Sequence, residues 1–478
     1  MNITEPIRSH ARTEPDAVAV IRSDGASVGY GAFDRTIDAV ARRMIEAGVG
    51  PGDFVAAGSL GEYADLVIRL ALARLGAAAA PATLSPLRTK LRIVRNADDL
   101  ARHPDAKVVE SRWFDPPPED ITPVPAFADA AAIMGLFASS GTTGRARLMQ
   151  VTHDMMATRV TSANDAIPLA APVRQVTVPS AQSGFGFTSR LRVLWSGGTL
   201  VSAPARPQDI VDLARRHEVD HLVLLPFWVP HLVAALPAGE RPLPSLACIE
   251  FGGSALPAPA LEAAQERLCA ELWNIYGATE GGYVATGRFG TLDHDAGEAG
   301  YPVPGVEVRA FDAGGTPLAP GVEGFLRMRG RAFVHGYLDD PEHSAEAFRD
   351  GWFEPGDLGS VSAAGVVRVG GRESHLLNVG GYKLNPSVVE RALASFDWVR
   401  DVSVFGVEDE HGLTQIAAAV VPARRIEPRD VEAMRVHRVP MPTVLIAVPA
   451  LPRNENGKVR RDELVAMAIA HRRKQPAR

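Results

Sequence analysis

A run of small and hydroxylated side chains follows an apolar stretch in the first third of the chain. Residues 133–147 read IMGLFASSGTTGRAR, and we expect the apolar part to be a strand that leads directly into the loop 139–144. Backbone N–H groups and hydroxyls in such a loop can approach a polyphosphate closely, because no bulky side chain stands in the way. The loop lacks the Gly-Lys-Ser/Thr ending of a Walker A motif, and an ordinary polar strand-to-helix loop is the alternative.

Four further polar segments follow along the chain. They read WNIYGATEGG (273–282), GWFEPGDLG (351–359), GGRESHLLNVGGYKLNP (370–386) and PRNENGKVRRDEL (452–464). Carboxylates such as Glu280 and Asp357 can accept hydrogen bonds or hold a hard cation, and the ammonium of Lys458 can neutralise a phosphate. Considered one at a time, the alternatives are a core tyrosine at position 276, a turn-capping aspartate and a surface lysine.

In this order and at this spacing, the five segments resemble the core motifs of the ANL superfamily of adenylate-forming enzymes. That superfamily includes acyl-CoA synthetases, peptide-synthetase adenylation domains and luciferases, and the resemblance extends from about residue 12 to residue 464. It implies that a substrate carboxylate attacks the α-phosphate of ATP, which gives an acyl-AMP and pyrophosphate. A carboxylic acid is already ionised at neutral pH, so this reaction needs charge neutralisation and in-line positioning and no general base.

The resemblance also implies a nucleotide site with ATP and Mg²⁺ as cofactors. The loop 139–144 would hold the β- and γ-phosphates, and Glu280 and Thr142 would contact the Mg²⁺. Tyr276 would stack on the adenine, and Asp357 would accept hydrogen bonds from the ribose hydroxyls. The complete set of expected nucleotide- and cofactor-binding residues is Ser139, Ser140, Gly141, Thr142, Thr143, Gly144, Gly253, Ser254, Tyr276, Gly277, Thr279, Asp357, Arg372, Gly380 and Gly381.

Three residues are the expected catalytic groups by the same resemblance: Lys458, Glu280 and Thr142. Lys458 would bridge the substrate carboxylate and the α-phosphate and so stabilise the charge that develops in the transition state. Arg372 would lie beside Asp357 as a hydrogen-bond donor. The reaction class expected of the protein is therefore an AMP-forming acid–thiol ligase.

The segment 379–384 (VGGYKL) resembles the family's thioester-forming loop, in which Gly380 and Gly381 would let the backbone approach the pantetheine arm of coenzyme A. A tight hairpin turn is the alternative, since Gly-Gly also makes one. The expected acceptor is coenzyme A. Two other acceptors stay open, the phosphopantetheine of an acyl carrier protein and an amine, and a non-catalytic nucleotide- or acyl-binding homologue is a further alternative.

The sequence departs from the family pattern at four positions. Arg147 stands where lysine is usual, Pro355 where threonine commonly precedes Gly-Asp, and Ser374 at the hinge position where aspartate or lysine is common. Gln182 stands about where many acyl-CoA synthetases carry a histidine that lines the acyl pocket. The departures at Gln182, Pro355 and Ser374 make a non-catalytic homologue an alternative, whereas arginine in place of lysine at 147 is expected to be tolerated.

The acyl pocket is expected to be short, because large aromatic side chains reduce its depth. We therefore expect a small aryl or short-chain carboxylic acid as the substrate. Plain core packing is the alternative for each aromatic residue. We expect Arg190 to lie exposed on a helix, and a contact with a second carboxylate or a polar tail of the substrate is its alternative. The candidate pocket residues are Gln182, Phe185, Phe187, Arg190, Phe227, Trp228, Ser254 and Gly277.

The patterns around these segments predict an α/β fold. Apolar residues at helical spacing over 31–48 and 64–76 alternate with short apolar runs such as 54–57, which is typical of sheets covered by helices. The alternation continues through residues 208–276. From about residue 283, short runs separated by Gly and Pro indicate antiparallel β-structure.

The resemblance implies two domains. Residues 1–371 would form a large N-terminal adenylation domain of α/β layers plus a β subdomain, which binds ATP and the acyl substrate. Residues 372–478 would form a small, mobile α+β C-terminal domain that carries Lys458 and the thioester-forming loop.

Composition and charge narrow the class of protein further. The 478 residues are 46% hydrophobic and 22% charged, as in globular proteins, and the net charge of −6 argues against a nucleic-acid partner. Two cysteines, Cys248 and Cys269, are too few for a disulfide framework. The first residues lack a signal-peptide pattern, and we expect neither a membrane span nor export. The expected location is therefore the cytoplasm. The expected assembly is a monomer or a homodimer.

Overall fold

The computed structural model describes most of the chain. The described residues are 1–58, 60–82, 84, 88–102, 106–139, 147–169, 172–202, 206–237, 243–254, 256, 258–269, 271–293, 297–379, 382–408, 413–435, 439–454 and 457–474. In this part of the chain, no helix combines the length and the apolar character that a bilayer crossing requires.

The first sheet is parallel except at one edge. Its strands lie in the order β6 (Lys107–Val108), β5 (Leu91–Val94), β3 (Phe54–Ala57), β4 (Ala78–Pro81), β7 (Ile133–Ala138) and β8 (Leu148–Thr152). Only the β7–β8 pair is antiparallel. Because β7 and β8 are antiparallel neighbours, the connection between them joins adjacent strand ends on the same side of the sheet. The expected phosphate loop is this connection.

The second sheet begins as a parallel sheet and continues as an antiparallel one. The strands β1 (Val18–Ile21), β10 (Thr199–Val201), β9 (Arg174–Thr177), β11 (His221–Leu224), β12 (Cys248–Gly252) and β13 (Glu271–Ala278) are parallel neighbours, and β2 (Ser27–Gly29) pairs antiparallel with β1. From β14 (Gly282–Arg288) onward the pairing is antiparallel. This confirms the change of character expected near residue 283.

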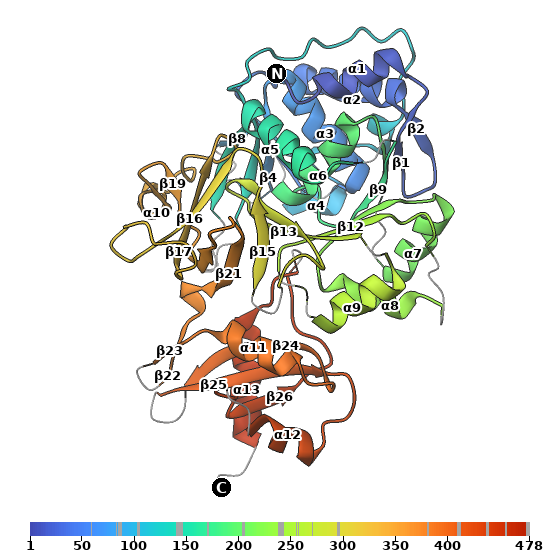
Figure 1. Cartoon of the computed structure of the whole chain (residues 1–478). Helices are drawn as coiled ribbons and strands as arrows, with labels where there is room; N and C mark the ends of the chain where they lie inside the picture. Colours follow the sequence, from blue (N-terminus) through green and yellow to red (C-terminus); the bar gives the residue numbers. More distant parts are fainter. Residues whose placement is uncertain are drawn as a thin grey trace.

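The antiparallel part forms a β subdomain, drawn in yellow and orange in Figure 1. Its further strands are β15 (Glu298–Pro302), β16 (Val306–Phe311), β17 (Gly324–Gly330), β18 (Phe348–Arg349), β19 (Trp352–Phe353), β20 (Asp357–Val361) and β21 (Val367–Arg372). The short helix α10 (Pro341–Ala347) begins at Asp340, whose side chain accepts a hydrogen bond from the N–H of His343. Strand β20 starts with Asp357 and β21 ends with Arg372, and these two residues face each other in the register.

Helices separate and cover the two sheets. The helices α1 (Glu5–Thr13), α2 (Tyr30–Glu46), α3 (Glu62–Leu75), α5 (His153–Ala166) and α6 (Gly184–Trp195) pack on one another, and α5 contacts both β8 and β14. The helices α7 (Pro207–Arg216), α8 (Trp228–Ala235) and α9 (Ala258–Arg267) share a core cluster with the outer face of β9, β11, β12 and β13. The C-terminal end of α3 agrees with the expected helix, because Gly76 adopts the left-handed conformation (φ 73°) that stops it. The short helix α4 (Ala97–Arg102) lies between β5 and β6, and the 3-10 helix η2 (Ser111–Phe114) lies between β6 and β7.

The C-terminal part is a separate small lobe, drawn in orange and red at the bottom of Figure 1. A three-stranded sheet of β24 (Val399–Glu408), β25 (Thr414–Pro422) and β26 (Val444–Ala447) packs against helices. The other elements of the lobe are η3 (Glu373–His375), β22 (Leu377–Val379), β23 (Tyr382–Leu384), α11 (Pro386–Ala394), α12 (Pro428–Arg435) and α13 (Arg461–Lys474). The mixed α/β architecture with a large N-terminal part and a small α+β C-terminal part is the one the sequence predicts.

Candidate active site

The two ends of the expected phosphate loop are fastened to each other. The N–H of Ser139 donates to the carbonyl of Arg147 (2.8 Å), and the N–H of Arg147 donates to Oγ of Ser139 (3.4 Å). The loop between them, which includes Ser140, Gly141, Thr142, Thr143 and Gly144, lies outside the described residues, as do Gly380 and Gly381 of the expected thioester-forming loop. Their expected roles stay predictions.

A carboxylate with two donors brings together side chains from three strands of the second sheet. The hydroxyl of Tyr276 on β13 donates to Oδ2 of Asp357 (2.6 Å), and Nε of Arg372 donates to Oδ1 of the same side chain (2.8 Å). Burial raises the pKa of Tyr276 well above its ordinary value, and the neighbouring Asp357 raises it further. Tyr276 is therefore a neutral donor at physiological pH. The structure brings these three predicted residues together.

Lys458 reaches the same place from the C-terminal lobe. Its loop is a tight turn in which the N–H of Lys458 donates to Oδ1 of Asn454 (2.9 Å), and the N–H of Asn454 donates to the carbonyl of Lys458 (2.9 Å). Burial lowers the pKa of Lys458, and the positive charges of Arg372 and Arg461 lower it further, whereas Asp357 opposes them. The lysine is therefore within electrostatic range of Arg461 in its own lobe and of the Asp357–Arg372 pair.

The turn that carries Lys458 packs against an aromatic side chain of the large N-terminal part. A Cβ added to Gly457 would lie 2.6 Å from the ring of Phe227, so only glycine permits this close approach, and Gly457 also has a positive φ of 75°. The guanidinium of Arg453 lies 5.7 Å from the centre of the Phe227 ring. Phe227 and Trp228 are themselves neighbours, with ring centroids 5.7 Å apart. Thus Phe227, a predicted pocket residue, also supports the lysine turn.

Glu280 follows the end of β13 and is buried, with 7% of its surface exposed. Its Oε1 accepts a hydrogen bond from the hydroxyl of Tyr337 (3.0 Å), and its backbone carbonyl accepts one from Nη2 of Arg159 (2.8 Å). Burial raises the pKa of the Glu280 carboxyl group, and the hydrogen bond from Tyr337 partly offsets that rise. Thr279 is half-buried in the same turn.

The donor set at Glu280 fits a magnesium ion that arrives with its nucleotide. Among the described residues, no group of three or more His, Cys, Asp or Glu side chains could hold a metal ion. Mg²⁺ is a hard cation that is commonly bound through one or two carboxylates together with substrate phosphates and water. A single buried carboxylate is what such binding requires of the protein.

The predicted pocket residues fall into two groups in the structure. Phe185 faces the start of the glycine segment, because a Cβ added to Gly252 would lie 2.9 Å from its ring, and its ring centroid lies 5.8 Å from that of Tyr283. Gly253, Ser254 and Gly277 are exposed. These residues, with Phe227 and Trp228, remain candidates for the acyl and nucleotide surfaces.

Two pocket candidates belong to the core instead. Phe187 is fully buried, with its ring centroid 6.2 Å from that of Phe137. The expectation of an exposed Arg190 is wrong, because this side chain is 2% exposed. It donates to the carboxylate of Glu62 and to the backbone carbonyls of Thr177, Pro179 and Gly186. A buried guanidinium requires such partners. The three carbonyls come from the preceding 13 residues, and the carboxylate comes from Glu62, 128 positions away.

The Gln182 side chain forms a hydrogen bond with a side chain of helix α3. Its Nε2 donates to Oδ2 of Asp65 on α3 (3.4 Å), and Oδ1 of Asp65 accepts from the N–H of Leu60 (3.0 Å). Burial raises the pKa of Asp65. Sequence reasoning missed this partner, as it missed Tyr337 and Arg159, because no pattern in the sequence links residues 57 to 121 positions apart.

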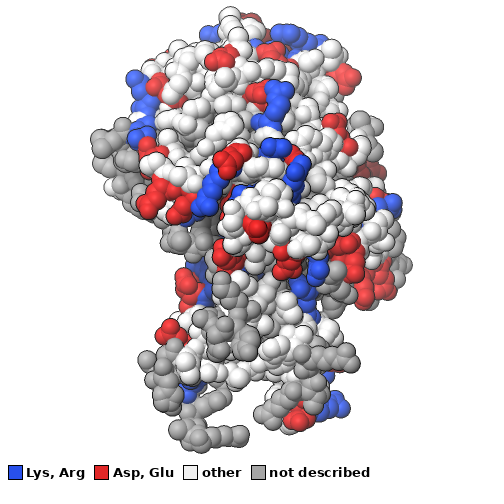
Figure 2. All heavy atoms as spheres, turned by 60° about the vertical axis from the view of Figure 1, so that its left-hand side comes forward, with Lys and Arg blue, Asp and Glu red and all other residues white. Residues whose placement is uncertain are grey.

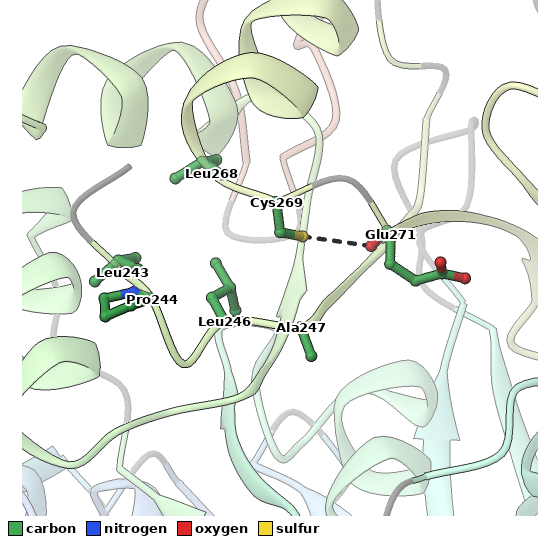
Figure 3. Close-up of a pocket in the computed structure, with 7 residues that line it drawn as sticks. All are labelled: Leu243, Pro244, Leu246, Ala247, Leu268, Cys269 and Glu271. Carbon is green, nitrogen blue, oxygen red and sulfur yellow. Dashed lines mark hydrogen bonds between the residues drawn. The ribbon is translucent and has the colours of Figure 1, made fainter. Parts of the chain in front are cut away.

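A surface pocket of about 290 Å³ lies elsewhere on the second sheet. Figure 3 shows its lining, which consists of Leu243, Pro244, Leu246, Ala247, Leu268, Cys269 and Glu271. Glu271 begins β13, whereas Tyr276 and Gly277 lie near the other end of that strand. The thiol of Cys269 donates to the backbone carbonyl of Glu271 (3.4 Å). This pocket is therefore separate from the cluster around Asp357 and Lys458.

Known proteins resemble the chain along nearly its whole length. It is 28% identical to enterobactin synthase component E of Escherichia coli (97% of this chain, 93% of the relative) and 26% identical to an indoleacetate–CoA ligase of Aromatoleum aromaticum (97% and 98%). It is also 26% identical to a medium/long-chain fatty acid–[acyl-carrier-protein] ligase of Mycobacterium tuberculosis (98% and 96%).

Solved structures share the fold. The amide bond synthetase McbA of Marinactinospora thermotolerans superposes with a TM-score of 0.83 at 24% identity (97% of this chain and 99% of that one). The o-succinylbenzoate–coenzyme A synthetase MenE of Bacillus subtilis, in complex with ATP and magnesium ion, superposes with a TM-score of 0.81 at 22% identity (96% and 98%).

The family model described as AMP-binding enzyme matches residues 82–338, more than half of the chain. This range contains the fastened loop ends at Ser139 and Arg147, and also Tyr276 and Glu280. The protein belongs to the AMP-binding enzyme family, within the ANL superfamily of adenylate-forming enzymes, and is an adenylate-forming ligase.

Proposed function

We propose that the protein is an ATP-dependent carboxylate–CoA ligase that acts on a small aryl or short-chain carboxylic acid. In the first half-reaction the acid's carboxylate forms a bond to the α-phosphorus of ATP and pyrophosphate leaves. In the second, the thiol of coenzyme A attacks the acyl carbonyl, loses its proton and releases AMP. One observation supports this most strongly: the turn that carries Lys458 in the C-terminal lobe packs on Phe227, and Lys458 is within electrostatic range of Asp357 and of its partner Arg372.

The residues of the cluster have complementary tasks in this proposal. Asp357, fixed by Tyr276 and Arg372, offers carboxylate oxygens to the ribose hydroxyls. Lys458 supplies positive charge where the attacking carboxylate and the α-phosphate approach each other. Glu280 would hold Mg²⁺, which neutralises phosphate charge when it is bound. Thr142 and the remainder of the loop 139–144 are proposed to hold the β- and γ-phosphates.

The small size of the acid is proposed from the side chains behind Phe185. The Tyr283 ring contacts Phe185, and the Tyr283 hydroxyl donates to Oε2 of Glu250 (2.9 Å). Glu250 is fully buried and forms an ion pair with Arg192, whose Nη1 donates to both carboxylate oxygens (2.8 Å to each). Displacing a buried ion pair to admit a long apolar chain is costly. These buried groups next to Phe185 support the proposal of a short acyl pocket.

The acceptor is proposed to be free coenzyme A, and an acyl carrier protein is the second candidate. The observation that favours the second candidate is the likeness to the fatty acid–[acyl-carrier-protein] ligase. An amine acceptor is a third possibility, suggested by the likeness in fold to an amide bond synthetase. Acid-dependent ATP–pyrophosphate exchange tests adenylation itself, and its absence with every acid of a broad panel would leave only a binding function.

A thiol-acceptor assay then separates the acceptors. The adenylated acid is offered free coenzyme A, a phosphopantetheinylated carrier protein or simple amines, and the acylated product is identified by mass spectrometry. A faster reaction with the carrier protein than with free coenzyme A would replace the first candidate by the second.

We propose no nucleic-acid partner, and the charge distribution agrees with this. Figure 2 shows one face of the molecule on which Lys and Arg side chains lie among Asp and Glu, without the continuous positive surface that binds a nucleic-acid backbone.

We also propose the domain division at residues 371/372, with 1–371 as the adenylation domain and 372–478 as the C-terminal domain.

We expect Phe185→Ala to change the order of preference among acids. Removing the ring opens space beside Gly252, so the ratio of kcat/KM for a longer acid to that for a short acid rises by about 10-fold or more. The measurement is kcat/KM over acids from acetate-sized to long-chain and aryl. Gln182→Ala is the comparison: its amide is engaged by Asp65, so we expect a similar decrease for every acid. An unchanged order in Phe185→Ala, or a wild-type preference for long-chain acids, contradicts the small pocket.

We expect the alkaline limb of kcat/KM for adenylation to lie below the ordinary lysine value of 10.5. Only the protonated form of Lys458 carries the useful charge, so activity falls as pH rises through its lowered pKa. Removing the positive charge of Arg461 raises that pKa, and Arg461→Gln therefore shifts the limb to higher pH. Arg460→Gln is the matched control, since Arg460 pairs with the exposed Glu463. A limb that does not move in Arg461→Gln contradicts the assignment of Lys458.

A further inference from the structure

Tyr337 has a fixed position in the loop between β17 and α10. Its backbone N–H donates to Oγ of Ser344 (2.8 Å), and its ring meets that of Phe348 edge-on with centroids 5.4 Å apart. Its backbone and its ring are therefore both held by this part of the β subdomain. A side chain held in this way can orient a group that it contacts.

The group that Tyr337 contacts is the carboxylate of Glu280. The Tyr337 hydroxyl donates to Oε1 of Glu280 at 3.0 Å. Glu280 lies 57 positions earlier in the chain, just after the end of β13. A phenol is an uncharged donor, so this hydrogen bond orients the carboxylate without neutralising it. A lysine or arginine in the same place would form an ion pair and compete with a cation for the carboxylate.

Arg147 connects Tyr337 with the base of the loop 139–144. Its guanidinium lies 5.5 Å from the centre of the Tyr337 ring, and its Nε lies 3.8 Å from Oδ2 of Asp340. Its backbone forms the two hydrogen bonds that fasten the loop ends through Ser139. The tyrosine thus lies between the loop base and Glu280.

We propose that Tyr337 is a positioning residue that holds the Glu280 carboxylate in place for the divalent cation that accompanies ATP. This inference rests on the proposed binding of ATP with a divalent cation. It predicts that the hydroxyl acts on cation affinity through Glu280, while the ring serves packing alone. Hydrogen-bond partners of metal ligands typically change metal affinity by about 10–100-fold when they are removed.

The variant that isolates the hydroxyl is Tyr337→Phe, which keeps the ring between Arg147 and Phe348. The probe is Mn²⁺, titrated by electron paramagnetic resonance into the protein with saturating ATP. We expect at least about 10-fold weaker Mn²⁺ binding than in the wild type. ATP affinity without a divalent cation is expected to stay within about twofold. Tyr30→Phe is the matched control, because its hydroxyl donates to the backbone carbonyls of Leu194 and Gly198, and it should leave Mn²⁺ binding unchanged.

A double-mutant cycle distinguishes positioning from a general structural role. If Tyr337 acts through Glu280, then Tyr337→Phe has no additional effect on Mn²⁺ binding in a Glu280→Gln background. Equal losses in both backgrounds, or unchanged Mn²⁺ binding in Tyr337→Phe, overturn the inference. A wild-type protein that binds neither ATP nor Mn²⁺·ATP contradicts the proposed function itself, so the two failures are distinguishable. Thermal unfolding of each variant identifies a folding defect. If Tyr337→Phe is less stable, isothermal titration at a lower temperature gives the same comparison on folded protein.

Discussion

Lys458→Ala is expected to lower acid-dependent ATP–pyrophosphate exchange by about two to three orders of magnitude, because a preorganised group that stabilises transition-state charge contributes roughly 3–4 kcal/mol. The ammonium is useful while the carboxylate attacks the α-phosphate. It has no such task once the acyl-adenylate exists. The same variant is therefore expected to convert a supplied acyl-adenylate to its thioester at close to the wild-type rate.

Both half-reactions must be measured on the same preparation. Lys90→Ala is a suitable control, because Lys90 is an exposed lysine of the first sheet region and lies outside the Asp357 cluster. Exchange close to the wild-type rate in Lys458→Ala would exclude the proposed role. Loss of both half-reactions together would indicate that the turn at Gly457 and its contact with Phe227 have been disturbed.

Asp357→Asn should raise the KM for ATP by about 10–100-fold, since hydrogen bonds that involve a charged group contribute roughly 1.5–3 kcal/mol. The amide keeps the shape of the carboxylate, loses its charge and can accept through only one of its two terminal atoms. It therefore cannot accept from Tyr276 and Arg372 together and also offer an acceptor to the ribose. The check is initial-rate kinetics of pyrophosphate exchange with varied ATP.

The control for Asp357→Asn is an aspartate–arginine pair on the surface. Asp24 pairs with Arg22 at 3.2 Å, and the aspartate side chain is 57% exposed, so Asp24→Asn should leave the KM for ATP unchanged. An ATP KM in Asp357→Asn that equals that of the wild type would remove Asp357 from the nucleotide site. The Tyr276 hydroxyl and Arg372 would then have a purely structural task.

The order of the secondary-structure elements was largely readable from the sequence. The expected strand at 54–57 is β3, and the expected helix at 64–76 is α3, which begins two residues earlier and ends at Leu75. These features depend on periodicity and on residues such as Gly76 that act within a single turn. The motifs likewise identified Tyr276, Glu280, Asp357, Arg372 and Lys458, because the residue types and their order are properties of the sequence.

The tertiary structure decided which of these side chains meet, and with which partners. Asp357 faces Arg372 because of the register between β20 and β21, and Tyr276 reaches the same carboxylate from β13. Lys458 joins them only because its lobe packs with Gly457 against Phe227. A one-residue change in register would turn each side chain to the other face of the sheet, and no local pattern contains that information.

The hydrogen-bond partners of buried polar groups also could not be predicted from the sequence. The chain alone indicates an arginine at 190, a glutamine at 182 and a tyrosine at 337. Only the folded chain gives Arg190 its backbone carbonyls, Gln182 its Asp65 and Tyr337 its Glu280. A buried polar group must find a hydrogen-bond partner wherever the fold supplies one, and that partner is as often distant in sequence as near. The sequence by itself determined which chemistry the residues can perform, and the packing of two sheets and a C-terminal lobe decided where they perform it.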